Sequence, residues 1–577
     1  MSSKTIFDFL NTGRIDNIAE NNLSFLFDMG KALLGSAKGL SDYSVSMIEP
    51  YLIAMTYFQG VEAEKLLKQE SDEVYASYMK LLEFNLDLWM RGARGGMDAI
   101  ARFMEKEIPE AVVSSFNTLF GYAGDDIYAY MRRAAFLIEG VSRAYPKAIE
   151  DIGPEFGFHF EKGNYPLLAE TDRFSVYRIL PLDPKKTVEN DKKPILILPP
   201  YVLGANILGF LPKDGKSYAH AYADNGFPVY IRVLKDIQTS TALQTMNGED
   251  DCLDTEFFLK KIKELHNKPV TLNGYCQGGF NALMNLLSGK LDGLVDALIT
   301  CVAPMDGTRS EGLHGFLKGL GERFNNLSYG VKTLSNGNKV ADGKLMGFVY
   351  KLKSIETESP LPAFFRDLSM FRNAYSGNEE LPEEISISKT ALALNYWLTN
   401  ERFDLPLGIT NLSFSSYNTP ISADGTLPVT LFGNKLNLKR INEKKTPWLI
   451  CYGENDELVE PTVATAPADY IDVEISPYPK GHVAMATSFS HAKSSMALYK
   501  RFGPDDKYRG PLRFHMDLDE ALDNAISEKT TGKKSTAVKS LKKTVQPDPQ
   551  STAADSPPKV TGEDKMAAKI NEPGGDS

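Results

Sequence analysis

The segment 274–279, Gly-Tyr-Cys-Gln-Gly-Gly, constrains this chain more than any other part of the sequence. An apolar run at 270–272 precedes it and a helix-like segment at 280–287 follows it. This strand–turn–helix order is typical of a nucleophile elbow, in which glycines allow a sharp turn that lifts the central side chain out of a sheet. The backbone N–H of Gln277 would then point at a substrate oxygen, and the start of the helix would favour a thiolate at Cys276. The alternative is a buried structural cysteine beside glycines.

Two later segments contain the side chains that a cysteine nucleophile needs. The run 448–452 has the composition of a buried strand, and Asp456 follows it closely. His482 lies in a loop after a short strand pattern at 473–475. The order nucleophile, acid, histidine is that of the α/β-hydrolase arrangement. We therefore expect Asp456 to orient His482, and His482 to deprotonate Cys276.

Neighbouring residues compete for both roles. Glu454 or Glu457 could supply the acid, leaving Asp456 as a turn former. His491 lies close to His482, and a histidine in a loop is often only a surface residue. The sequence favours the triad because all three residue types occur in the required order.

Short apolar runs alternate with helical patterns over the central part of the chain. Such alternation predicts an α/β fold, with a mainly parallel sheet covered by helices on both faces. The loop 199–206 follows the first of these runs, where the second oxyanion donor is expected. The backbone N–H of Tyr201 or of Val202 could supply it. Strands are expected at 195–198, 229–233, 270–272, 297–302 and 448–452.

The 577 residues exceed one ordinary domain. Residues 1–150 have apolar side chains at steps of three and four, which predicts an all-helical region. A bundle packed on the catalytic domain is favoured over an amphipathic region that docks on a hydrophobic surface. Residues 165–515 are expected to form the α/β-hydrolase-like domain, with an aromatic-rich insertion at about 307–440. This insertion would be a cap that shields a thioester from water or, equally, the ordinary core of a subdomain. The composition of 527–577 predicts a disordered tail.

Composition excludes several functional classes. A net charge of -11 argues against a general nucleic-acid binder. The four cysteines form no C-x-x-C pair and no Cys/His cluster, so we expect no metal site and a reducing environment. No signal-peptide core and no run long enough to span a bilayer is evident, which predicts a cytoplasmic protein without a transmembrane segment.

The region from about 190 to 500 resembles the polyhydroxyalkanoate synthases, cysteine-dependent polymerases of the α/β-hydrolase fold. The segment 274–279 is similar to their modified lipase box, and Pro-Pro-Tyr-Val at 199–202 is similar to their loop after the oxyanion strand. Tyr396-Trp397 with Leu405-Pro406 resembles their cap signature. Asp456 and His482 correspond to their acid and base.

Two residues and one segment depart from the family pattern, which indicates a divergent member. Glu457 follows the acid where the family usually has a histidine, and Phe280 stands where it usually has a small hydroxyl residue. The segment 203–206, Leu-Gly-Ala-Asn, replaces the usual continuation of the loop.

The resemblance implies an acyltransferase that forms a polyester from hydroxyacyl-CoA. Cys276 would attack the thioester, CoA would leave, and the acyl group would pass to a hydroxyl of the growing chain. Coenzyme A enters as part of the substrate, and no cofactor is expected. A polyester granule surface and a second copy of the chain are open as partners. Two alternatives remain: a thioesterase or polyester depolymerase that uses the same triad with water, and a non-enzymatic granule-associated protein on a hydrolase fold.

Overall fold

A computed structural model describes residues 71–188, 192–314, 330–344, 346–347, 354–375, 387–487 and 490. The predicted tail at 527–577 lies outside the described residues, as do residues 1–70 of the predicted helical region and residues 491–515 at the end of the predicted catalytic domain.

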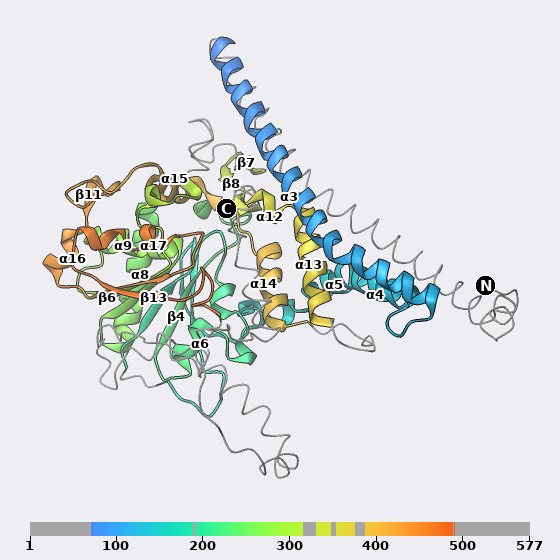
Figure 1. Ribbon diagram of the computed structural model, residues 1–577. Coiled ribbons are helices and arrows are strands. Elements are labelled where there is room, and N and C mark those ends of the chain that lie inside the picture. Colours follow the sequence, from blue (N-terminus) through green and yellow to red (C-terminus); the bar gives the residue numbers. More distant parts are fainter. Residues whose placement is uncertain are drawn as a thin grey trace, which may run out of the picture.

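The centre of the molecule is an eight-stranded sheet in the order β1-β2-β4-β3-β5-β6-β12-β13 (Figure 1). Strand β2 runs antiparallel to β1 and β4, whereas β4, β3, β5, β6, β12 and β13 are parallel to one another. This order, with an antiparallel second strand, is the strand order of the α/β hydrolases, and the chain has that fold. The strands are β1 Leu167–Glu170, β2 Phe174–Ile179, β3 Ile195–Leu198, β4 Val229–Leu234, β5 Val270–Tyr275, β6 Val295–Cys301, β12 Trp448–Gly453 and β13 Glu474–Tyr478.

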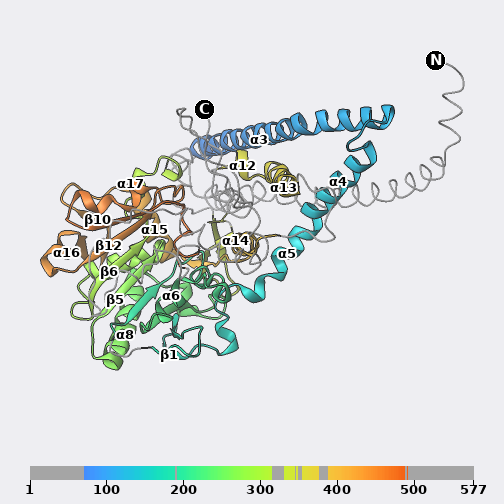
Figure 2. The same cartoon turned by 60° about the horizontal axis from the view of Figure 1, so that its bottom comes forward.

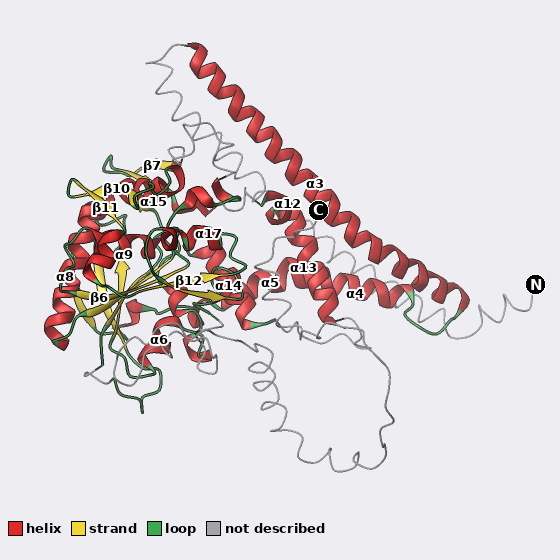
Figure 3. Cartoon of the chain, turned by 60° about the vertical axis from the view of Figure 1, so that its left-hand side comes forward, coloured by secondary structure: helices red, strands yellow, loops and turns green. Residues whose placement is uncertain are grey.

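Helices cover both faces of this sheet (Figure 3). On β5, the side chain of Asn273 donates to the hydroxyl of Tyr218 at 2.7 Å, so this face of the strand meets α6. Gly274 points the other way, because a Cβ built on it would lie 2.4 Å from Cα of Gly279 in α9. The helices are α6 Tyr218–Ala223, α8 Gly248–His266 and α9 Gln277–Leu287.

Local sequence explains the sheet and its helices. All four residues of β3, Ile-Leu-Ile-Leu, are buried, as expected for a strand covered on both faces. Helix α8 begins with a capping box, in which the Asn247 side chain accepts from the N–H of Asp250 and the Asp250 side chain accepts from the N–H of Asn247. It ends at Asn267 in the left-handed conformation.

The segment between β6 and β12 corresponds in sequence position to the cap insertion expected at about 307–440. It lies against the loop that follows β3: the N–H of Phe403 donates to the carbonyl of Val202 at 3.0 Å, and Nε1 of Trp397 donates to the carbonyl of Leu203 at 3.3 Å. These bonds hold the insertion at the edge of the sheet where β3 and β5 end. Its elements include β7 Val331–Thr333, β8 Lys339–Ala341, α12 Ile355–Glu358, α13 Pro360–Tyr375, α14 Lys389–Asn400, β9 Leu405–Pro406, α15 Leu407–Asn418, β10 Thr426–Leu431, β11 Asn434–Asn437 and α16 Lys439–Lys444.

The N-terminal part of the described chain is helical, with α3 Ser71–Phe120, α4 Ile127–Glu139 and α5 Tyr145–Asp151 (Figure 2). Helix α3 packs on the insertion: Phe103 contacts Phe365 with ring centroids 5.2 Å apart, and Arg372 pairs with Glu107 at 3.1 Å.

A different face of α3 is exposed. Apolar residues spaced three or four apart, such as Tyr75, Leu82, Leu86 and Trp89, are 41–67% exposed. Within the described chain, no helix combines the length and the apolar composition that a membrane span requires.

Candidate active site

The predicted elbow forms at the carboxyl end of β5. Cys276 joins this strand to α9 with φ 52° and ψ -126°, a conformation that costs a residue with a side chain about 1–3 kcal/mol. Its N–H donates to the carbonyl of Cys301 at 2.7 Å, and its carbonyl accepts from Gly279 at 2.9 Å. Cys276 is half-buried, whereas the residues of the strand and helix on either side of it are buried. The strained turn therefore presents the thiol at the carboxyl ends of the central strands.

The glycines of the elbow are required by close backbone approaches. A Cβ on Gly278 would lie 2.3 Å from the carbonyl oxygen of Leu198 and 2.5 Å from that of Pro199. No side chain fits between two backbones at this separation. The loop after β3 consequently runs directly against the first turn of α9, beside Cys276.

Asp456 and His482 are in direct contact. Oδ2 of Asp456 lies 2.8 Å from Nδ1 of His482. Oδ1 of the same carboxylate accepts from the N–H groups of Leu458 and Val459, both at 2.9 Å, which fixes its orientation. Asp456 is 2% exposed and His482 is 9% exposed. A buried, charge-assisted hydrogen bond of this kind holds the imidazole in one orientation.

The competing residues do not share this environment. Glu454 and Glu457 are both exposed, so of the three candidate acids Asp456 is the buried one, and it is the one in contact with His482. His491 lies outside the described residues.

The environment of His482 favours its protonated form. Burial alone would lower the pKa of His482, but interactions with the Asp456 carboxylate and with the Cys276 side chain outweigh it and raise the pKa to about 10. Nε2 of His482 is buried and makes no hydrogen bond of normal geometry to the described residues. At neutral pH the site can therefore hold an imidazolium on Asp456.

Tyr275 supports the histidine in a way that the motif did not reveal. Its hydroxyl donates to the carbonyl oxygen of His482 at 2.6 Å, and its ring meets the imidazole edge-on at 6.2 Å. The residue before the nucleophile thus holds the loop of the base, although 207 residues separate the two in sequence.

The predicted oxyanion donors lie on the two segments that meet at the elbow, the loop after β3 and the start of α9. Gln277 is the first residue of α9, so its N–H has no partner within the helix. The N–H groups of Tyr201 and Val202 donate to no other residue in the described part of the chain. The contact of Gly278 with Leu198 and Pro199 brings this loop to the elbow. All three amides therefore stay candidates for the predicted oxyanion site, and the choice between Tyr201 and Val202 stays open.

Two side chains at these positions are bound to other parts of the protein. The side-chain amide of Gln277 donates to the hydroxyl of Ser413 on α15, which ties the insertion to the elbow. The hydroxyl of Tyr201 enters a buried polar cluster. Neither contact has a local sequence signal, because the partners are far apart in the chain.

No family model matches this chain, and no curated protein matches it. Solved structures do. A putative aryl esterase from Burkholderia cenocepacia aligns with a TM-score of 0.31 and 11% identity over 56% of this chain and 93% of its own. A thioesterase domain from the curacin biosynthetic pathway aligns with a TM-score of 0.30 and 12% identity over 58% and 98%. An esterase from Exiguobacterium antarcticum aligns with a TM-score of 0.30 and 13% identity over 55% of this chain and 92% of its own.

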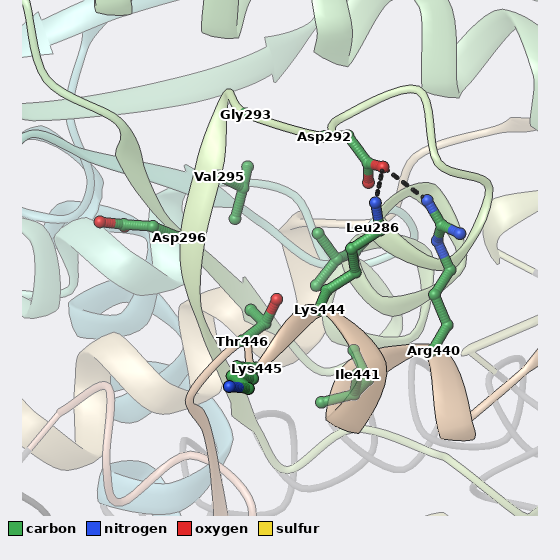
Figure 4. Close-up of a pocket in the computed structure, with 10 residues that line it drawn as sticks. All are labelled: Leu286, Asp292, Gly293, Val295, Asp296, Arg440, Ile441, Lys444, Lys445 and Thr446. Atoms are coloured by element: carbon green, nitrogen blue, oxygen red, sulfur yellow. Dashed lines mark hydrogen bonds and ion pairs between the residues drawn. The ribbon is translucent and has the colours of Figure 1, made fainter.

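A separate pocket lies at the other end of the strands, next to the amino ends of β6 and β12 (Figure 4). Val295 at the start of β6 and Thr446 before β12 line it, whereas Cys276 and Asp456 follow the ends of their strands. Asp292 in this pocket accepts from Arg440 and Lys444, each at 2.7 Å. The pocket is therefore distinct from the candidate active site.

Proposed function

We propose that this protein is an acyl-transfer enzyme that forms an acyl-cysteine at Cys276 from an acyl thioester. The observation that carries the proposal is the buried Asp456–His482 pair, 2.8 Å apart, beside a cysteine held in a strained turn at the same edge of the sheet. A nucleophile, a base and an orienting carboxylate in this relation are the parts that covalent acyl transfer needs.

The first half-reaction follows from the protonation of the site. The Cys276 thiolate adds to the thioester carbonyl, and the amides of Gln277 and of Tyr201 or Val202 stabilise the resulting oxyanion. The carbon–sulfur bond to coenzyme A then breaks. His482 gives its proton to the departing thiolate, which leaves an acyl-cysteine and a neutral imidazole.

The second half-reaction needs an oxygen acceptor. Neutral His482 removes a proton from the acceptor hydroxyl, whose oxygen attacks the acyl-cysteine, and Cys276 leaves as a thiolate. We propose a hydroxyacyl chain as the acceptor, as in polyester synthesis. The support is the nucleophile itself: exchange between thioesters is nearly balanced in energy, so cysteine can hold an acyl group and pass it on.

Hydrolysis is the second candidate. The same triad activates water as readily as a hydroxyl, and the reaction then is that of a thioesterase or a depolymerase. The two candidates share every step up to the acyl-cysteine and differ only in the acceptor.

The test compares wild type with Cys276→Ala on 3-hydroxybutyryl-CoA, following release of coenzyme A and analysing the acyl product. Wild type should release coenzyme A, and the variant should lose at least a thousandfold in rate. Oligomer or polymer would identify the synthase, and free hydroxy acid the hydrolase. Cys252→Ala is the matched control, because Cys252 is buried away from the elbow against Ser288 and should leave the rate unchanged. Equal release by wild type and Cys276→Ala would refute the proposal.

A further inference from the structure

A buried polar cluster lies between the loop that follows β3 and helices α8 and α9. We call it the Tyr201 cluster. Its five members come from four parts of the fold and are all 2% exposed or less. They are Tyr201 after β3, Arg232 on β4, Asp251 and Thr255 on α8, and Asn285 on α9.

An ion pair forms the centre of the cluster. Nη1 of Arg232 lies 2.8 Å from Oδ1 of Asp251. The Tyr201 hydroxyl donates to the same carboxylate and accepts from Nη2 of Arg232 at 3.0 Å. Arg232 also lies over the ring of Phe174, with Cζ 4.1 Å from the centroid. Tyr201 is thus held by both charges of a pair that has no access to water.

The cluster is connected to the helix of the nucleophile. Nδ2 of Asn285 donates to Oδ2 of Asp251 at 2.7 Å. Asn285 belongs to α9, the helix that begins immediately after Cys276. The Asp251 carboxylate therefore binds both the loop of Tyr201 and helix α9, which begins with Gln277. Each of these two segments carries a candidate oxyanion donor.

Stability alone is a weak reason for such a cluster. Removing two charges from water costs several kcal/mol per ion, and apolar replacements of buried ion pairs are often neutral or stabilising. What an ion pair of this kind does supply is a directional constraint. Here the constrained group is the side chain of Tyr201, and the loop that carries it packs at Pro199 against Gly278, two residues after Cys276.

We propose that Arg232 and Asp251, acting through the hydroxyl of Tyr201, are positioning residues that set the backbone of residues 199–203 against Cys276. The inference rests on the proposed acyl transfer and assigns it residues that never touch the substrate. A displacement of about 1 Å in a catalytic group can cost on the order of a hundredfold in rate. The loss of one anchoring hydroxyl is thus expected to reduce kcat without affecting the thiol.

The Tyr201→Phe variant tests this directly, because it removes the hydroxyl and leaves the Arg232–Asp251 contact in place. We expect kcat on a thioester substrate to fall at least tenfold, with little change in KM. The second readout is the rate at which iodoacetamide alkylates Cys276. Alkylation forms no oxyanion, so this rate should stay within about twofold of wild type.

Tyr230→Phe is the matched control. Tyr230 is a buried tyrosine on the same strand as Arg232, and its hydroxyl contacts Nε2 of His266 at 2.8 Å, away from the elbow. This variant loses one part-buried hydroxyl contact and should keep the wild-type kcat.

Three results would overturn the inference: a wild-type kcat in Tyr201→Phe, an equal loss in both tyrosine variants, or a parallel loss of alkylation and turnover. Failure of the proposed function is distinguishable, because wild type would then show no turnover that depends on Cys276.

Discussion

The substitution Asp456→Asn tests the candidate site most directly, because it removes one charge and almost no volume. The amide oxygen of Asn can still accept from the N–H groups of Leu458 and Val459, so the turn after β12 should persist. Its NH2 group then faces Nδ1 of His482, where the carboxylate oxygen lay at 2.8 Å. An Asn NH2 group and a protonated Nδ1 are both hydrogen-bond donors and cannot bond to each other. The variant therefore disfavours the forms of His482 that carry a proton on Nδ1.

The size of the effect follows from the geometry. Two unit charges about 4 Å apart interact by about 4 kcal/mol at an effective dielectric constant of about 20. Since about 1.4 kcal/mol corresponds to a factor of ten, Asp456 accounts for roughly a thousandfold preference for the imidazolium form of His482. We expect kcat to fall about 10³- to 10⁴-fold, as in other triads that lose the carboxylate.

The assay measures kcat for release of coenzyme A, together with the alkylation rate of Cys276 at pH 7 and the thermal unfolding midpoint. Both rates should fall while the unfolding transition stays cooperative. Glu454→Gln and Glu457→Gln are matched controls, because each removes one nearby exposed carboxylate, and both should retain wild-type rates. An Asp456→Asn enzyme within threefold of wild type would refute the reasoning, and a large loss in either glutamine variant would reassign the acid.

Two further predictions concern the elbow and the histidine. Gly278→Ala should destabilise the protein by about 1–3 kcal/mol in urea unfolding, because its Cβ would lie 2.3 Å from the Leu198 carbonyl oxygen. Gly293 has φ +74° and open space around it, so Gly293→Ala should lose only about 1–2 kcal/mol of stability, through backbone strain. If both alanine variants were as stable as wild type, this account would be contradicted. His482 should titrate near pH 10, so NMR should show an imidazolium at pH 8. The raised pKa of His482 stabilises the folded protein fully below about pH 6.5, and this stabilisation is lost as the pH rises through about 10. An NMR spectrum with a neutral His482 ring at pH 8 would argue against the charged pair.

Local sequence predicted the sheet well where the strands are buried and parallel. The apolar runs at 195–198, 229–233 and 448–452 correspond to β3, β4 and β12, because strands covered on both faces need continuous apolar sequence. Strands β1 and β2 were not predicted. They pair antiparallel at the margin of the sheet, where β1 has exposed and half-buried residues and gives no continuous apolar signal.

In α3 the sequence predicted the secondary structure correctly, but not the burial of the apolar face. Its periodicity correctly indicated a helix, since spacing depends only on the helical repeat. The same residues were expected to pack against the rest of the molecule, yet Tyr75 and Trp89 are 67% and 60% exposed. Periodicity identifies an apolar face but carries no information about what lies opposite it.

The sequence by itself determined the nucleophile elbow and the order of the candidate residues, because a strand, a glycine turn and a helix within about twenty residues are set by local sterics. It left open whether Asp456, Glu454 or Glu457 meets the histidine. Only the tertiary structure decided this, by burying Asp456 against His482 and leaving both glutamates exposed. It also placed the Tyr201 hydroxyl between Arg232 and Asp251. Burial and long-range hydrogen bonds depend on which segments pack together, and this information is absent from any single stretch of the chain.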